Sequence, residues 1–200
     1  MTKIKFCGLK RKIDIDYANV IRPDYIGFVF VRESVRYVQA EEAKLLRSKL
    51  HSGIVPVGVF ADEPVENVAR MLNEGVIDVA QLHGREDDSY IARLRQMADR
   101  PIIQAFGISS ETDVTRALRS PADYILFDNQ CGGSGKTFEW SLLSSIQRPF
   151  FLAGGLNATN IRQAILLLRP FAVDISSSVE TSKFKDQDKM RLIADAVRSI

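Results

Sequence analysis

The chain has 200 residues, of which 46% are hydrophobic and 26% are charged, a composition typical of globular proteins. Its net charge of +2 is too small to indicate a nucleic-acid or membrane partner. It contains no apolar run of about 18 residues, no apolar signal-peptide core, and only two cysteines, Cys7 and Cys131. We therefore expect a cytoplasmic protein with a single domain over residues 1–200.

Short runs rich in β-branched and aromatic residues recur along the whole chain and predict eight strands. These strands are expected at 3–6, 25–30, 54–59, 79–82, 102–105, 124–127, 150–152 and 172–175. Helical patterns separate them. Helices are expected at 14–21, 39–50, 64–74, 140–146 and 186–200. Three more are expected to begin after capping residues: one after Asp88 or Ser89, one after Ser110, and one after Asn157 or Thr159.

This strand–helix alternation predicts an α/β fold, a single (β/α)8 TIM barrel. An open doubly wound sheet is the alternative, but it usually has fewer strands and a clear edge. In a barrel, functional residues lie at the C-terminal strand ends. The residues at these ends are Cys7, Arg32, Arg36, Asp62, His83, Gly84, Gly107, Asp128, Gly154, Gly155, Ser176, Ser177 and Ser178.

Cys7 stands where the first strand stops, and Gly8 then allows the backbone to turn. Ile4 and Phe6 alternate with Lys5 and Cys7, so the thiol faces away from the apolar side of the strand. Most single cysteines are small buried hydrophobes, whereas a thiol at a strand end beside a basic residue is placed for chemistry.

The last two loops resemble a phosphate site. Gly154 and Gly155 let the backbone approach an anion, and the following helix offers N–H groups. Ser176, Ser177 and Ser178 add hydroxyls and amides on the neighbouring loop. The alternative is a glycine helix entry beside a serine-rich turn.

Three other side chains are candidates for the site. Asp128 ends a strand and can transfer protons, although it could also cap a turn. Arg36 can clamp a carboxylate, with Arg32 as its rival. His83 is expected to touch the pocket, and a chain with only two histidines does not suit a His-rich metal site.

The segment 132–137, GGSGKT, resembles the end of a nucleotide P-loop, but Gln130 stands where the first glycine is required. We interpret this segment as an active-site loop, and closure over the ligand is one hypothesis for it.

Together these segments resemble the phosphoribosylanthranilate isomerase family of tryptophan biosynthesis over nearly the whole chain. The resemblance is carried by KFCGL at 5–9, GFVF at 27–30, SVRY at 34–37, GVF at 58–60, QLHG at 81–84, LFD at 126–128, GGSGKTFEW at 132–140, GGLN at 154–157 and DISSSVE at 174–180. The sequence departs from the family pattern at Lys10, at Ser178 and at 181–186, which lacks the usual Pro-Gly.

The resemblance implies a barrel without metal or organic cofactor that performs an Amadori rearrangement of a small phosphosugar. It implies Asp128 as general acid, Cys7 as general base, Arg36 as the group that holds the anthranilate carboxylate, and the last two loops as the phosphate site. We expect no nucleic-acid or membrane partner, and a monomer or homodimer.

Acid–base chemistry requires Cys7 and Asp128 to start in opposite protonation states. Their ordinary pKa values, about 8.5 and about 3.9, lie in the wrong order, so the site must shift them or use a minor population. Lys5 is a candidate for favouring the thiolate, and we hypothesise that it pairs with Asp174 on the adjacent strand.

Two alternatives to this activity stay open. A different phosphosugar barrel would need either paired histidines and aspartates for a metal, as in a pentose-phosphate epimerase, or an aspartate in place of Cys7, as in the histidine-pathway isomerase. A non-catalytic phospho-ligand-binding barrel is the other alternative, and the presence of both Cys7 and Asp128 argues against it.

Overall fold

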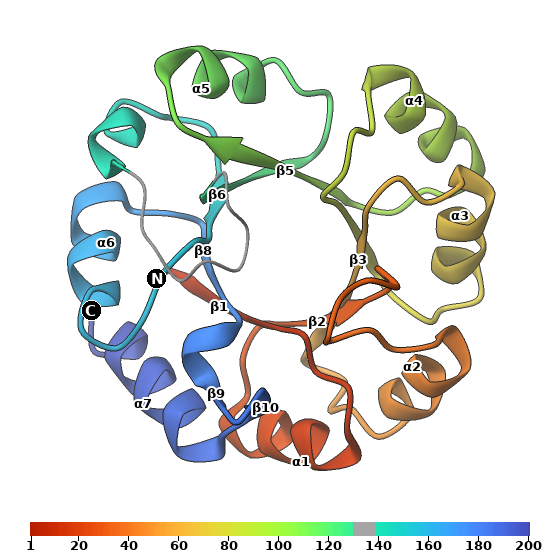
Figure 1. Ribbon diagram of the computed structural model, residues 1–200, viewed down its shortest axis with the longest axis horizontal. Helices are drawn as coiled ribbons and strands as arrows, with labels where there is room; N and C mark the ends of the chain where they lie inside the picture. The colour runs from red at the N-terminus through yellow and green to blue at the C-terminus, as the bar shows by residue number, and fades with distance from the viewer. Residues whose placement is uncertain (130–138) are drawn as a thin grey trace.

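The protein is a closed β-barrel ringed by helices in its computed structural model, which describes residues 1–129 and 139–200 (Figure 1). The barrel strands in these ranges are β1 (Lys3–Cys7), β2 (Tyr25–Val29), β3 (Val55–Phe60), β4 (Val79–Leu82), β5 (Ile102–Ile108), β6 (Tyr124–Asn129), β7 (Phe150–Leu152) and β8 (Ala172–Ile175). All neighbouring strands are parallel, and β8 pairs with β1 to close the ring. The predicted barrel is therefore confirmed, and the open sheet is excluded.

Helices follow the strands around the outside of the ring (Figure 1). They are α1 (Lys12–Ile21), α2 (Ala40–Arg47), α3 (Val65–Asn73), α4 (Asp88–Met97), α5 (Glu111–Leu118), η1 (Trp140–Leu143), α6 (Ile161–Leu168), η2 (Ser177–Val179) and α7 (Gln187–Arg198). None of those in the described ranges is long and apolar enough to cross a bilayer.

Helix starts were predicted with mixed success. The Ser110 cap is confirmed, because its side chain accepts a hydrogen bond from the Asp113 amide. Asp87, one residue before the expected pair, caps α4. The helix expected at 140–146 is only the short 3-10 turn η1. Asn157 caps a turn ahead of α6, which itself begins after Asn160.

The sequence patterns did not predict a small hairpin that follows β8 and η2. Its two strands are β9 (Glu180–Thr181) and β10 (Phe184–Lys185), and they pair antiparallel. Ser182 and Lys183 make the turn between them, both with positive φ, 52° and 68°.

The alternation along β1 places its residues as predicted. Ile4 and Phe6 belong to the apolar layer between the barrel and its helices, whereas Lys5 and Cys7 face the barrel interior. Aliphatic and aromatic side chains fill the interior beneath Cys7: Tyr25, Val57, Val79, Ile103, Leu126, Phe151 and Ala172. This packing leaves the C-terminal end of the barrel as the place for a cavity.

Candidate active site

A cavity of about 380 Å³ opens at the C-terminal ends of the strands, a size that suits a small-molecule ligand. Every side chain or backbone that the sequence assigned to the site lines it. These residues are Cys7, Arg36, His83, Asp128, Gly154, Gly155, Ser176, Ser177 and Ser178.

Four other residues at strand ends lie elsewhere, among them Gly84, which lines the same groove as Gly107. Arg32, the rival of Arg36, is exposed. Asp62 binds Arg85 through an ion pair of 3.1 Å on the rim outside the cavity. Gly107 lines a separate groove between the β4 and β5 loops. The choice of Arg36 over Arg32 is therefore supported by position.

Cys7 sits in a space that Gly27 of β2 leaves for it. A Cβ at position 27 would lie 2.6 Å from the Cys7 Sγ atom, so any side chain there would displace the thiol. Beneath Cys7, the fully buried Lys5 Nζ donates to Asp174 Oδ2 at 2.8 Å. This contact confirms the hypothesis that Lys5 and Asp174 pair between adjacent strands.

Lys5 lowers the pKa of the Cys7 thiol, as expected, but the effect of burial outweighs it. Burial raises the pKa of Cys7, the ammonium groups of Lys5 and Lys185 lower it, and Asp174 raises it further. The net pKa lies above the usual value for cysteine. The resting thiol therefore keeps its proton at neutral pH, and the thiolate is a minor population.

Asp128 lies three strands from Cys7 around the ring, on β6. Its Oδ1 accepts a hydrogen bond from the Asn129 amide at 2.7 Å, and its Oδ2 lies 3.6 Å from His83 Nε2. Burial raises the pKa of Asp128, and His83 and the Asn129 amide oppose this only in part. A carboxyl group with a raised pKa retains a proton to higher pH and is suited to donate it.

The two glycines after β7 adopt the left-handed conformations that their role requires. Gly154 has φ 82° and Gly155 has φ 65°. A Cβ on Gly154 would lie 2.8 Å from both the Asn129 N and the Asp128 Oδ1 atoms. The glycine therefore lets the loop after β7 pass directly beside the carboxyl group.

The serine hydroxyls on the next loop are largely committed to the protein. Ser176 Oγ donates to the Cys7 carbonyl at 3.0 Å, and Ser178 Oγ donates to the Leu156 carbonyl at 2.6 Å. These bonds tie the loop after β8 to β1 and to the loop after β7. An anion between the two loops would therefore meet mainly backbone amides rather than these two hydroxyl hydrogens.

Arg36 is held from two sides. Gly8, with φ 84°, leaves room for its side chain, because a Cβ there would clash with Arg36 Cδ. Its Nε and Nη2 atoms donate to the two carboxylate oxygens of Glu180, at 2.7 and 2.8 Å. Sequence reasoning missed Glu180 as part of the site.

Two more polar side chains in the cavity were also missed as site residues. Gln81, on β4, and Asp174, on β8, both line it. Within the described residues, the buried Gln81 Oε1 and Asp174 Oδ1 atoms have no hydrogen-bond partner. A glutamine at an inward position of the apolar strand VAQL was the pattern that could have identified Gln81.

The segment GGSGKT at 132–137 and Cys131 lie outside the described residues, so their predicted role as an active-site loop stays a prediction. Within the described residues, no group of three or more His, Cys, Asp and Glu side chains is arranged to hold a metal ion.

A thiol and a carboxyl group face one cavity at the C-terminal end of a (β/α)8 barrel, beside a glycine loop and an arginine, an arrangement suited to acid–base chemistry. The family model described as N-(5'phosphoribosyl)anthranilate (PRA) isomerase matches residues 4–196. A protein of Endomicrobium trichonymphae named N-(5'-phosphoribosyl)anthranilate isomerase is 42% identical over 204 residues, covering 100% of both chains. This chain belongs to the phosphoribosylanthranilate isomerase family, and it is an isomerase.

Solved structures agree with this assignment. The phosphoribosyl anthranilate isomerase of Thermotoga maritima superposes with a TM-score of 0.93, at 35% identity and full coverage of both chains. A second isomerase structure, in complex with reduced 1-(o-carboxyphenylamino)-1-deoxyribulose 5-phosphate, gives a TM-score of 0.89 at 32% identity, again with full coverage.

Proposed function

We propose that the cavity converts N-(5'-phosphoribosyl)anthranilate into 1-(2-carboxyphenylamino)-1-deoxy-D-ribulose 5-phosphate, in tryptophan biosynthesis, with Asp128 as general acid and Cys7 as general base. The observation that carries the assignment of roles is the single cavity that both groups line, from β6 and β1. The compound in the second solved relative is a reduced form of this product, which supports the choice of reaction.

The reaction needs two proton transfers between enzyme and substrate and one within the substrate. Asp128 gives its proton to the furanose oxygen, the C1–O bond breaks, and the nitrogen lone pair forms a Schiff base at C1. Cys7, as thiolate, then removes the proton from C2, and the electron pair of the C–H bond moves into an enolamine. Proton shifts from O2 to C1 give the ketone, so substrate and product are isomers.

The two pKa shifts predict a bell-shaped pH dependence of kcat/KM. The rate rises with pH as Cys7 loses its proton, and it falls with pH as Asp128 loses the proton that it must donate. The raised pKa of Cys7 makes the active form, a thiolate beside a protonated Asp128, a minor population, and the raised pKa of Asp128 offsets this in part.

The remaining residues bind the two ends of the substrate. Gly154 and Gly155, together with Ser176, Ser177 and Ser178, would hold the phosphate, mainly through backbone amides. Arg36 would hold the anthranilate carboxylate. His83 lies beside Asp128 and lines the same cavity.

Compartment and assembly are part of this proposal. A cytoplasmic location fits a chain with two cysteines and no disulfide framework. A monomer or a homodimer is expected, and one solved structure is of monomers generated from the dimeric isomerase of Thermotoga maritima.

A steady-state assay tests the proposal, with phosphoribosylanthranilate generated in situ and its fluorescence loss followed over time. We expect activity in the wild type and a decrease of at least ~100-fold in Cys7→Ser and in Asp128→Asn. Asp62→Asn is the matched control, because this carboxylate also follows a strand but lies outside the cavity. Folded wild-type protein without activity would redirect the search to sister phosphosugar substrates.

A further inference from the structure

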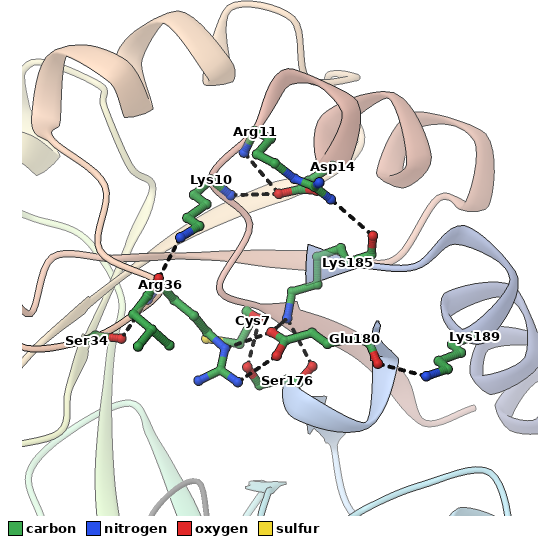
Figure 2. A network of polar contacts seen from close by, with 11 residues as sticks. Cys7, Lys10, Arg11, Asp14, Ser34, Arg36, Ser176, Glu180, Lys185 and Lys189 are labelled. Carbon is green, nitrogen blue, oxygen red and sulfur yellow. Dashed lines mark hydrogen bonds and ion pairs between the residues drawn. The ribbon is translucent and has the colours of Figure 1, made fainter. Parts of the chain in front are cut away.

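Glu180 is the centre of a cluster of three charged side chains, of which Arg36 lines the cavity (Figure 2). Its carboxylate accepts from Arg36 Nε and Nη2, at 2.7 and 2.8 Å, and from Lys185 Nζ at 2.6 Å. The Glu180 and Lys185 side chains are only 7% and 1% exposed. We call Arg36, Glu180 and Lys185 the charge triad.

The triad joins two parts of the chain that are far apart in sequence. Arg36 follows β2, whereas Glu180 and Lys185 are partners across the β9–β10 hairpin. Figure 2 shows the Arg36 and Lys185 side chains pointing toward the Glu180 carboxylate from different sides. The hairpin thus brings one carboxylate between two cations, one of which, Arg36, lines the cavity.

The carboxylate is charged in spite of its burial. Burial raises the pKa of Glu180, but the hydrogen bonds and charges of Arg36 and Lys185 outweigh it, and the net pKa is lowered. Burial lowers the pKa of Lys185, and Glu180 opposes this. With both cations protonated, the triad carries one net positive charge, which suits an anionic ligand. The three side chains hold one another in place, because moving either cation away from the buried carboxylate would leave a buried charge unpaired.

The hairpin turn indicates that this arrangement is maintained against local strain. A two-residue turn with positive φ at both positions favours asparagine and glycine, but here Ser182 and Lys183 occupy it. Such strain persists where the surrounding structure imposes it, and it concentrates at functional sites. The Glu180–Lys185 ion pair joins the two strands at the base of this turn.

For Arg36, the triad fixes the plane of the guanidinium group. Two of its nitrogens, Nε and Nη2, are used by Glu180, and within the described residues Nη1 has no protein partner. The side chain lines the cavity. Its remaining donors are therefore oriented in advance for a second carboxylate, that of the substrate.

For Cys7, the triad supplies a nearby cation. Lys185 Nζ donates to the Ser176 carbonyl at 3.0 Å, and Ser176 Oγ donates to the Cys7 carbonyl at 3.0 Å. The charged groups that face the thiol are Lys5 from β1, Asp174 from β8, Lys185 from β10 and Arg36 from the loop after β2. Lys185 lowers the pKa of the thiol and so favours the thiolate.

We propose that Glu180 is a positioning residue of the isomerisation: it orients Arg36 for the substrate carboxylate and holds the Lys185 ammonium beside Cys7. This inference rests on the proposed function of the cavity. Glu180 itself touches neither the reacting atoms nor the thiol in this role, and it acts through its two cationic partners.

Glu180→Gln removes the charge at nearly constant volume and leaves one oxygen to accept hydrogen bonds. Arg36 loses its two-point attachment, so we expect KM to rise at least ~10-fold, which corresponds to about 1.4 kcal/mol. Lys185 loses the partner that opposes the effect of its burial, so its ammonium form is disfavoured. The support of the thiolate weakens, and the pH midpoint for alkylation of Cys7 should rise.

The experiment compares wild type, Glu180→Gln, Arg36→Met and the control Glu33→Gln. Glu33 is an exposed carboxylate in the same loop as Arg36. For each variant, KM and kcat come from the fluorescence assay, and the rate of iodoacetamide alkylation is measured against pH in a Cys131→Ser background. A merely structural defect would slow turnover without moving the alkylation midpoint.

The proposal is supported by a KM at least ~10-fold higher and an alkylation midpoint at higher pH in Glu180→Gln, with neither change in Glu33→Gln. It is overturned by values in Glu180→Gln that match Glu33→Gln while Arg36→Met raises KM. If Glu180→Gln does not fold, Glu180→Asp, which is too short to keep both cations in place, replaces it with the same criteria. Wild-type protein without activity refutes the proposed function alone, because the alkylation midpoint still tests the link from Glu180 to Cys7.

Discussion

Replacing Lys5 with methionine removes an ammonium group that is completely buried beneath the cavity. Its Nζ donates to Asp174 Oδ2 at 2.8 Å, and the Asp174 side chain is only 8% exposed. The other oxygen, Oδ1, already has no hydrogen-bond partner within the described residues. The variant therefore leaves a buried carboxylate without its cation.

The expected loss of unfolding free energy is about 3–5 kcal/mol, the range for removing one partner of a buried pair. An exposed pair would contribute only about 0–1 kcal/mol. Burial lowers the pKa of Lys5, but Asp174 and Cys7 more than offset this and the net pKa is raised. A raised lysine pKa means that the contribution is fully present below about pH 10.4, and so at neutral pH.

A second variant separates the charge effect from general damage. Lys5→Met combined with Asp174→Asn removes both charges, so at least ~2 kcal/mol of the lost stability should return. Activity should not return, because Cys7 still lacks the ammonium that lowers its pKa. Urea unfolding, followed by circular dichroism, measures the stability of the wild type, Lys5→Met, Asp174→Asn and the double variant. A loss below about 1 kcal/mol in Lys5→Met, or a double variant no more stable than Lys5→Met, would refute the reasoning.

Three further changes have definite expected outcomes. Asp128→Asn should raise stability at pH 7 by about 1 kcal/mol while activity falls. The pKa of this carboxyl group is raised in the folded protein, so its ionisation destabilises the fold at pH values above its pKa in the unfolded chain. Thermal unfolding at pH 4 and pH 7 checks that the gain grows with pH. Lys183→Gly should stabilise the exposed hairpin turn by about 0.5–1 kcal/mol, since φ is 68° there, and Lys183→Ala, which keeps the strain, should show no gain in urea unfolding. Gly154→Ala should reduce kcat/KM at least ~10-fold, because its Cβ would approach the Asn129 amide and the Asp128 carboxyl group; unchanged kinetics would contradict this geometry.

Strand periodicity accounts for the part of the site that the sequence predicted best. The alternation in β1 put Lys5 and Cys7 on one face, and barrel closure then put Asp174 beside Lys5, as the structure confirms. This inference needed only the two-residue period of a strand and the order of strands in a ring. The strand period is a property of a short segment, and the order of strands follows from the fold class, so both can be inferred from the sequence.

The charge triad could not be predicted in this way. Strands of two residues are too short for a period, and the turn residues Ser182 and Lys183 lack the usual preference for positive φ. Glu180 and Arg36 are 144 positions apart, so nothing local shows that this glutamate is buried. The net pKa of Cys7 was equally out of reach, because it depends on a balance between burial and four surrounding charges.

The contacts that build the site cross the junction where the ring closes, and this has a consequence for the newly made chain. Lys5 and Asp174 are 169 positions apart, as are Cys7 and Ser176. At about 5–20 residues per second, roughly 10–30 seconds of synthesis separate Lys5 from its partner. Throughout that interval the lysine has only water to solvate its charge, which opposes early collapse of the first strands around it. The proposed site is therefore complete only when β8 and the hairpin have docked against β1.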